Sequence, residues 1–388
     1  MKQGWEIKKL GEVLVKTEMV DPTKNPNREF TYLDVSSVNK ETKEIEEATV
    51  LLGKDAPSRA RKLVRENDVI FATVRPTHSR VALITEEYDG QVCSTGYFVL
   101  RGKENIDNKY LFYYLLTDEF NKQMKKLQKG ASYPAVTDAE VKSIFLRFPK
   151  SLPEQERIVS ILDEAFAAIA KAKANAEQNL KNAKELFESY LQRVFESGNW
   201  ETKTIELVCD EIFAGGDAPK NNFSLEPNEK HTIPIYANAV KDSGLYGYTD
   251  FARVTKPCVT IAARGSGTGH TELRNEHFLP IVRLIVCIPD TKQISTEFLK
   301  YTIDNLVIQR SGSAIPQLTV PMIKDYKIPV PSIEEQKQII EKAETLKQKK
   351  ENLENVYLKK IEGLEELKKS ILQKAFAGEL KTEKAVAV

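Results

Sequence analysis

The chain has 388 residues, of which 41% are hydrophobic and 29% are charged, and its formal net charge is +1 at pH 7. This length suggests two or three domains. The balanced charge means that no overall electrostatic field singles out nucleic acid as the partner. The sequence shows no apolar run of membrane length and no hydrophobic leader after Met1, so we expect a cytoplasmic protein.

Cysteine usage points to a reducing compartment and not to a metal site. The four cysteines are scattered and contain no Cys-x-x-Cys pair, so we expect them to act as small apolar residues: Cys93, Cys209, Cys258 and Cys287.

Residues 1–150 are predicted to form one mixed α/β domain. The β-rich runs indicate strands, and one run with helical spacing indicates a single helix before a turn at Gly130-Ala131-Ser132-Tyr133-Pro134. The strands are expected over residues 30–35, 68–74, 96–101 and 144–148, and the helix over residues 108–128.

Residues 151–197 are predicted to form one long amphipathic helix. Ser151 and Glu154 fit a capping box, and neither Pro nor Gly follows Pro153 until Gly198. Apolar residues recur in steps of mostly three and four along a thin, Ala-rich stripe that includes Ile158, Leu162, Ile169 and Ala176. A helix of this length would extend roughly 65 Å, and so thin a stripe requires one partner helix.

The chain supplies that partner, because the domain and its helix are repeated. Residues 198–331 repeat the mixed domain with a different sequence, with strands expected over residues 257–264 and 281–288, and residues 332–380 repeat the helix before a short tail of residues 381–388. Glu154-Gln155 aligns with Glu335-Gln336 and Phe195 with Phe376 at one constant offset of 181 residues. The second stripe includes Ala343, Leu353, Leu367 and Ala375. We therefore predict an α+β fold in which two α/β domains, in a tandem pseudo-two-fold repeat, are separated by two long antiparallel coiled-coil helices.

The two domains share landmarks but differ in their loops. Residues 54–65 have no obvious counterpart, and the run from Arg75 to Arg80 is replaced by the run from Arg264 to His270. Two similar scaffolds with different loops suit two half-sites on one elongated ligand, and DNA is such a ligand. Arg and Lys side chains can reach phosphates and guanine edges. Arg75 and Arg264, which follow matching strands, are expected to occupy matching positions. The residues expected to contact DNA are Arg59, Arg61, Lys62, Arg75, Thr77, His78, Ser79, Arg80, Ser132, Tyr133, Lys220, Asn221, Arg264, Ser266, Thr268, His270 and Ser313.

Simpler interpretations of several of these residues remain open. The cluster of Lys122, Lys125, Lys126 and Lys129 could follow a phosphate backbone, but a solvated helix face is the better explanation of it. His78 and His270 have no metal-ligand partner nearby in the sequence, so a surface-loop histidine is the better explanation of each.

Catalytic motifs are weak. The glycine-rich run from Gly265 to Gly269 follows a strand but opens no helix, so a tight loop that approaches a ligand explains it better than a nucleotide-binding loop. Asp290 and Asp325 loosely suggest nuclease carboxylates but are widely separated. No His-Glu-x-x-His, Cys/His cluster or Asn-Pro-Pro-Tyr element is present. The sequence therefore indicates a binding protein without metal or catalytic residues.

Over its full length the chain resembles the specificity (S) subunit of type I restriction-modification enzymes. The resemblance rests on the Gly/Ser-x-Pro elements, the Glu-Gln helix entries and the helix end from Leu372 to Leu380, each modest alone but ordered in two copies. The Gly/Ser-x-Pro elements are Gly130 to Pro134 and their counterpart Gly312 to Pro316. The first copy departs slightly, with Pro153 inside the helix entry.

The resemblance implies a non-catalytic, DNA-binding subunit of a phage-defence system. Two target-recognition domains would each read half of a bipartite site on double-stranded DNA, and the helices would set the spacer. Two modification (methyltransferase) subunits and two restriction (translocase and nuclease) subunits would be the partners. They would bring S-adenosylmethionine, ATP and Mg²⁺ for adenine methylation and cleavage, and no cofactor is expected in this chain. The alternatives are a coiled-coil scaffold that holds two protein-binding domains, which would expose apolar patches, and a fused enzyme, for which the duplication leaves no room.

Overall fold

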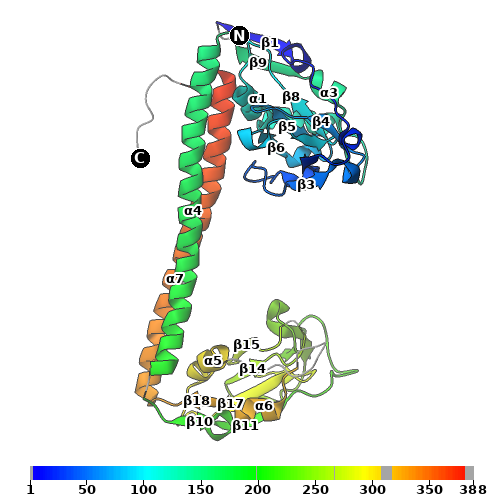
Figure 1. The fold of residues 1–388 in the computed structure, drawn as a ribbon. Helices are drawn as coiled ribbons and strands as arrows, with labels where there is room; N and C mark the ends of the chain where they lie inside the picture. Colours follow the sequence, from blue (N-terminus) through cyan, green and yellow to red (C-terminus); the bar gives the residue numbers. More distant parts are fainter. Residues whose placement is uncertain (1–2, 198, 266, 307–316, 381–388) are drawn as a thin grey trace. The chain divides into compact units, whose positions relative to one another are not determined.

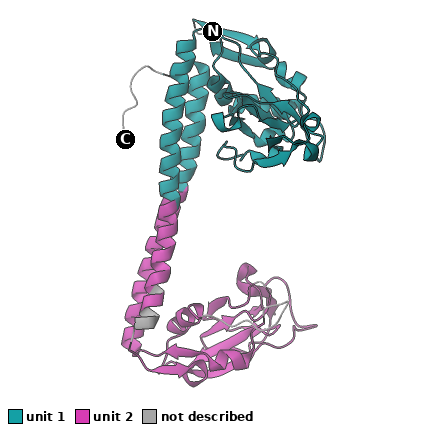
Figure 2. Cartoon of the chain, in the orientation of Figure 1, with its two compact units in different colours: residues 1–177, 359–388 teal, residues 178–358 magenta. Residues whose placement is uncertain are grey.

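The computed structural model describes residues 3–197, 199–265, 267–306 and 317–380 (Figure 1). The described chain divides into two compact units (Figure 2): residues 1–177 with 359–388, and residues 178–358. Each unit therefore contains one α/β domain and half of a helix pair. The predicted α+β class, with tandem domains and two long helices, is confirmed.

The first domain contains three small sheets with strand orders β1-β9, β3-β2-β7-β4 and β6-β5-β8. Its strands are β1 Trp5–Lys9, β2 Glu29–Leu33, β3 Thr49–Leu52, β4 Ala60–Leu63, β5 Val69–Ala72, β6 Val81–Leu83, β7 Val92–Ser94, β8 Tyr97–Leu100 and β9 Phe145–Pro149. Its helices are α1 Asn108–Leu115, α2 Asp118–Leu127 and α3 Asp138–Lys142. The prediction of one helix over residues 108–128 was wrong, because the Thr117 hydroxyl accepts a hydrogen bond from the Phe120 amide at 3.2 Å and starts a new helix.

The second domain repeats this plan with strand orders β10-β18, β13-β12-β16 and β11-β17-β14-β15. Its strands are β10 Thr202–Thr204, β11 Cys209–Ala214, β12 Ile233–Tyr236, β13 Leu245–Thr249, β14 Cys258–Ile261, β15 Thr271–Arg274, β16 Leu279–Pro280, β17 Ile285–Pro289 and β18 Lys327–Pro329, and its helices are α5 Thr296–Asp304 and α6 Val320–Asp325. The pairings match: β5 lies antiparallel between β6 and β8, as β14 lies between β15 and β17, and β2 runs parallel to β7 as β12 does to β16.

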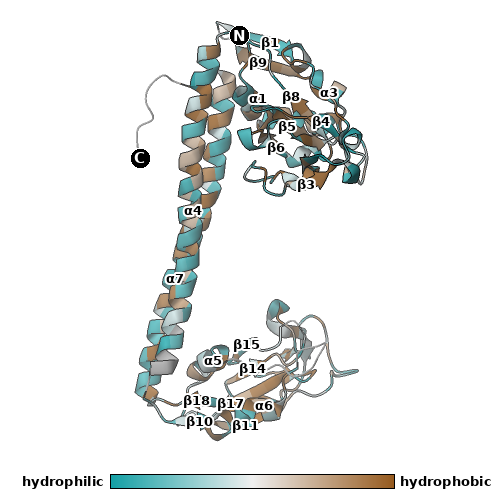
Figure 3. Ribbon diagram, viewed as in Figure 1, coloured by the Kyte–Doolittle hydropathy of each residue, from teal (hydrophilic) through white to brown (hydrophobic). Residues whose placement is uncertain are grey.

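The two long helices are α4 Leu152–Ser197 and α7 Ile333–Ala377. They pack together within each unit. In the first unit Lys173 of α4 pairs with Glu365 of α7 at 2.6 Å, while Ile158 and Leu162 share a core with Leu372 and Phe376, so the two segments run antiparallel. Figure 3 shows hydrophilic and hydrophobic residues alternating along both helices. The predicted stripe is buried at Ala343 and Ala375 but not at Leu353 and Leu367, whose relative exposures are 43% and 47%.

A buried glutamine joins each long helix to its domain in the same way. The Gln155 amide donates hydrogen bonds to the carbonyls of Asn105 and Pro149 at 3.1 and 2.8 Å, and its oxygen accepts one from the Asp107 amide at 2.9 Å. Gln336 repeats this pattern, with bonds to the carbonyls of Gln293 and Pro331 and from the Ser295 amide at 2.8, 2.9 and 2.9 Å. Asp107 and Ser295 cap α1 and α5, so each glutamine ties the start of a long helix to the start of a domain helix.

The described helices include none that is both long enough and apolar enough to cross a bilayer. All four cysteines are free thiols, and three of them are buried, as expected for small apolar residues.

Candidate nucleic-acid interface

Two equivalent loops follow the central strands of the two domains. The first loop, residues 73–80, connects β5 to β6, and the second loop, residues 263–270, connects β14 to β15. The amide before each loop donates to the carbonyl that ends it: Ala72 to Arg80 at 2.9 Å and Ala262 to His270 at 2.8 Å. The loops therefore have the same length and close in the same way.

The start of each loop is held by the segment that precedes α3 or α6. The Val136 amide donates to the Thr73 carbonyl at 2.9 Å, and the Leu318 amide donates to the Ala263 carbonyl at 2.8 Å. The next residue in each loop forms an isolated bridge, Val74 with Ala135 and Arg264 with Gln317. This register makes Arg264 the equivalent of Val74, so the prediction that Arg75 and Arg264 occupy matching positions was wrong by one residue.

The backbone of the two loops also turns at the same places. Arg75 has a φ of 49° and its equivalent Gly265 has a φ of 80°, while Ser79 and its equivalent Gly269 have φ values of 48° and 93°. This left-handed conformation is natural for glycine and uncommon for Arg or Ser. The first loop therefore holds larger side chains on a backbone that the second loop builds with glycine.

The side chains that these loops display are different. At matching positions the first loop has His78 and Arg80 where the second has Thr268 and His270. Arg75, His78 and Arg264 are exposed, and Thr77 is half-buried. One backbone form therefore offers two sets of hydrogen-bonding groups, which is what two different base sequences require.

An exposed aromatic ring lies beside the first loop. The guanidinium carbon of Arg75 is 5.2 Å from the centre of the Tyr133 ring, and the Arg75 amide donates to the Pro134 carbonyl at 2.7 Å. Tyr133 is 73% exposed and Ser132 is exposed next to it. The counterpart of this turn in the second domain includes Ser313, which lies outside the described residues, as does Ser266.

The lysine cluster of α2 adjoins the first loop. Thr77 lines a hollow of about 290 Å³ together with Lys122 and Lys125, which are both exposed. Lys129 instead pairs with Glu140 at 2.9 Å. Two lysines beside an Arg- and His-bearing loop form a surface suited to a phosphate backbone.

Three expected contact residues are engaged within the fold. The Lys62 side chain is only 12% exposed, and its ammonium donates to the Asp138 carboxylate at 2.7 Å and to the Tyr97 carbonyl at 2.6 Å. Thr268 is 5% exposed and its hydroxyl donates to the Gly265 carbonyl at 2.7 Å. Arg61 lies 3.6 Å from Asp21. The side chains of Lys62 and Thr268 are therefore bonded within the fold and are not available to contact a ligand.

Three other predicted residues, Arg59, Lys220 and Asn221, lie outside the two loops, whereas His270 ends the second loop. Arg59 is exposed just before β4, a strand with no equivalent beside β16 in the described part of the second domain. Lys220 and Asn221 are exposed in the connection between β11 and β12. The His270 ring lies 3.1 Å from the Glu272 carboxylate, and that contact orients it at the end of the second loop.

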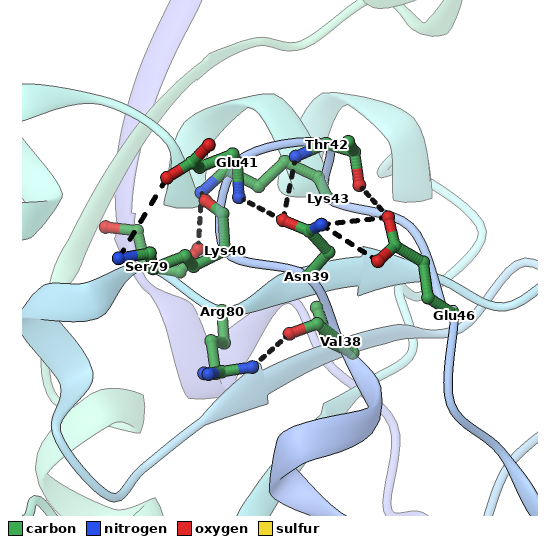
Figure 4. Close-up of polar contacts among 9 residues, drawn as sticks. All are labelled: Val38, Asn39, Lys40, Glu41, Thr42, Lys43, Glu46, Ser79 and Arg80. Atoms are coloured by element: carbon green, nitrogen blue, oxygen red, sulfur yellow. Dashed lines mark hydrogen bonds and ion pairs between the residues drawn. The ribbon is translucent and has the colours of Figure 1, made fainter. Parts of the chain in front are cut away.

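Sequence reasoning missed the residues that hold the loops. In the second domain the Asn238 amide group donates to the Arg264 carbonyl at 3.0 Å, and its oxygen accepts from the Ala263 and Arg264 amides. In the first domain Lys43, which was also missed, ties another segment to the first loop, and so does Arg80, which was expected to contact DNA and whose guanidinium donates to the Val38 carbonyl (Figure 4). These contacts join residues far apart in sequence, so no local sequence pattern predicts them.

Neither carboxylate considered for catalysis belongs to a reactive cluster. Asp290 accepts hydrogen bonds from the Gln293 side chain at 2.8 Å and the Lys292 amide at 3.0 Å, which lower its pKa and close a turn. Within the described ranges, no group of three or more His, Cys, Asp or Glu side chains is arranged to hold a metal ion.

Comparison with known proteins gives one consistent family. The sequence matches the type I restriction modification DNA specificity domain over residues 2–181 and 197–363. A putative type I specificity subunit of Mycoplasma pneumoniae is 31% identical over 250 residues, which cover 61% of this chain and 72% of that protein. The HindI specificity subunit of Haemophilus influenzae is 25% identical over 251 residues, which cover 62% of this chain and 48% of that protein.

Solved structures agree with this match. The crystal structure of the HsdS subunit from Thermoanaerobacter tengcongensis is similar with a TM-score of 0.71 and 29% identity, and 98% of each chain is covered. A chain in a structure of the assembly and conformational transition of a type I restriction-modification system gives a TM-score of 0.84 at 28% identity, with 98% of this chain and 99% of that chain covered.

Proposed function

The chain belongs to the type I restriction modification DNA specificity family, and on that premise we propose that it reads a bipartite sequence in double-stranded DNA. Each α/β domain is a target-recognition domain that reads one half-site. The first domain reads with Arg75, Thr77 and His78, supported by Tyr133, and the second reads with Arg264 and His270.

The observation that carries this proposal is the equivalence of the two loops. Residues 73–80 and 263–270 close with the same hydrogen bonds and turn at the same positions, yet they display different polar side chains. A rigid backbone with interchangeable donors and acceptors is suited to reading base edges in the major groove. The cationic side chains of Lys122 and Lys125 next to the first loop would hold phosphates and set its orientation.

The long helices have two further roles in this proposal: they set the distance between the two half-sites, and they bind the partner subunits. A continuous helix is a stiff element, so α4 and α7 would fix the number of base pairs between the half-sites. Several large apolar side chains on these helices face solvent, and exposed apolar residues mark surfaces that partners cover. These are Leu186, Leu353, Val356, Leu358 and Leu367. We assign these exposed side chains to contacts with two modification (methyltransferase) subunits, with two restriction subunits joining the assembly.

In this assembly the chain would be non-catalytic. The modification subunits would bring S-adenosylmethionine and the restriction subunits would bring ATP and Mg²⁺, while this chain supplies recognition and geometry.

The direct test is selection of duplexes from a random pool by the complex of this chain with its modification subunits. We expect enrichment of two short specific sequences at one fixed separation. Assembly of the complex without enrichment of any sequence would contradict the proposal and would favour a protein scaffold.

A further inference from the structure

A second segment of the first domain is fastened to the first loop (Figure 4). This segment, residues 34–48, connects β2 to β3 and is longer than its counterpart, residues 237–244, in the second domain. From the first loop, the Arg80 guanidinium donates hydrogen bonds to the Val38 carbonyl and, at 3.3 Å, to the Ser36 carbonyl. The end of the first loop is thereby fixed to the base of the segment.

A second hydrogen bond runs in the opposite direction, from Lys43 in the segment to the first loop. Its ammonium donates to the Ser79 carbonyl at 2.7 Å and also to the Lys40 carbonyl. Ser79 is the residue with positive φ that closes the loop. Holding its carbonyl therefore fixes the turn that presents His78, the exposed residue immediately before it.

The tip that carries Lys43 is held together by its own hydrogen bonds. The Asn39 side chain accepts a hydrogen bond from the Glu41 amide at 2.7 Å and donates to the Glu46 carboxylate at 2.9 Å, and the Thr42 hydroxyl donates to Glu46 at 3.0 Å. These hydrogen bonds restrict the backbone that carries Lys43, so they help to hold its ammonium beside the first loop. A lysine on an open surface without such bonds would not be held in this way.

The charges around Lys43 work against keeping it protonated. Burial is the largest cause that lowers the pKa of Lys43, and together with the nearby cations Lys368 of α7 and Arg80, against the opposing charge of Glu41, it brings that pKa from 10.5 to about 8. Glu41 also faces Lys173 of α4, which is paired with Glu365. A lysine whose folded-state pKa lies below its unfolded value makes folding more favourable as pH rises between the two values. Its charge at neutral pH therefore costs stability.

The second domain achieves the same fastening with another residue. Asn238, in the short connection between β12 and β13, bonds to the backbone of Ala263 and Arg264 at the start of the second loop. Each domain thus holds its loop from the same neighbouring connection, but at opposite ends of the loop.

We propose that Lys43 is a positioning residue for specificity in the first domain: through the Ser79 carbonyl it holds the first loop in the form that reads one half-site. This inference rests on the proposed function. It adds a residue that lies outside the loop and that need not touch DNA.

The test uses the complex with the modification subunits and three variants: Lys43→Met, Lys43→Arg and, as matched control, Lys40→Met. Lys40 is exposed in the same tip and its ammonium lies 4.0 Å from Glu41. Binding is measured for duplexes with both half-sites, with the first scrambled and with the second scrambled. We expect Lys43→Met to lose about tenfold in discrimination at one half-site only, with no fall in unfolding temperature, and Lys40→Met to match the unmodified chain.

A pH series separates positioning from a merely structural role. Between pH 7 and 9 the unmodified chain should lose discrimination at that half-site, because Lys43 loses its charge and charge-assisted hydrogen bonds are the stronger ones. Lys43→Arg should keep it at pH 9, since arginine stays protonated. Unchanged discrimination in Lys43→Met, or an equal loss at both half-sites with a lower unfolding temperature, would overturn the inference. If the unmodified chain itself discriminates neither half-site, the proposed function fails instead.

Discussion

Arg264 occupies the position of Val74, since each forms the isolated bridge that begins its loop, with Gln317 and Ala135 respectively. The two loops have the same backbone conformation, but Arg75 and Arg264 extend from different positions in it. Arg75 stands one residue further on, where the second domain has Gly265. The two half-sites should for this reason be read with different geometry, and an Arg in both loops does not imply the same base at both.

Replacing Arg75 by glycine should separate stability from recognition. Glycine suits the left-handed backbone at this position, as Gly265 shows, so the gain of roughly 1 kcal/mol in backbone energy should offset the lost contact with Tyr133. We expect a thermal unfolding midpoint that is unchanged or slightly higher, together with loss of recognition at one half-site. Arg75→Lys, which keeps the charge, should retain part of the recognition. A large drop in the midpoint would show that Arg75 is structural.

Arg264→Ala should affect the other half-site alone. Loss of one bidentate contact to a base costs about 1–3 kcal/mol, so recognition there should fall by about tenfold or more. The measurement is methylation of sites that differ in one half only, compared with Arg75→Ala. Methylation patterns unchanged in both halves in both variants would exclude these two arginines from recognition.

Gln155→Met should destabilise the first unit strongly. The side chain is fully buried and makes three hydrogen bonds, so its loss leaves the Asp107 amide and the carbonyls of Asn105 and Pro149 without a partner. Each unpaired buried group costs about 1–3 kcal/mol. The matched control is Gln178→Met, at an exposed position of the same helix, which should change the free energy of unfolding by less than about 0.5 kcal/mol. Equal effects in chemical denaturation would show that the buried clamp contributes little.

Acid should loosen the start of α3 before the rest of the first domain. The Glu140 carboxylate accepts hydrogen bonds from Lys129 at 2.9 Å and from the Thr137 amide at 2.8 Å, which lower its pKa from 4.5 to about 2. A lowered folded-state pKa means that this stabilisation is complete above pH 4.5 and is lost as pH falls towards 2. Glu140→Gln should reduce the pH dependence of stability in this range, measured by unfolding at several pH values. A slope identical to that of the unmodified chain would contradict the assignment.

Lengthening the helix pair should lengthen the DNA spacer. One helical turn inserted after Ala176 in α4, with a matching turn between Leu358 and Ile361 in α7, adds about 5.4 Å. Base pairs are stacked about 3.4 Å apart, so the preferred spacer should grow by one or two base pairs. Methylated motifs in a host that carries the longer chain would show this directly, and an unchanged spacer would remove the helices from any measuring role.

Much of the architecture follows from periodicity and from the internal repeat. The predicted helix of residues 151–197 is α4, and the predicted start at Ser332 is confirmed by a capping box in which the Ser332 amide donates to Glu335 at 2.9 Å and the Glu335 amide donates back to the Ser332 hydroxyl at 3.4 Å. The break at Thr117 was missed because the apolar spacing continues across it, and only the cap shows the interruption.

The site was harder to predict because its geometry is non-local. Local alignment paired Arg75 with Arg264, whereas bridges to residues more than fifty positions away set the register. Lys62 looked like part of a basic surface, but its partner Asp138 lies in α3, far along the chain. No sequence pattern around Lys43 predicts its role, because that role depends on a hydrogen bond to Ser79 in another loop.

The central claim is that this chain directs modification to a bipartite site, and methylome sequencing tests it most directly. A host that expresses the chain with its modification subunit is compared with a host that lacks the chain. We predict a new adenine-methylated motif made of two specific halves with a gap of fixed length. A complex that assembles and methylates DNA with no such motif, or with only one specific half, would contradict it.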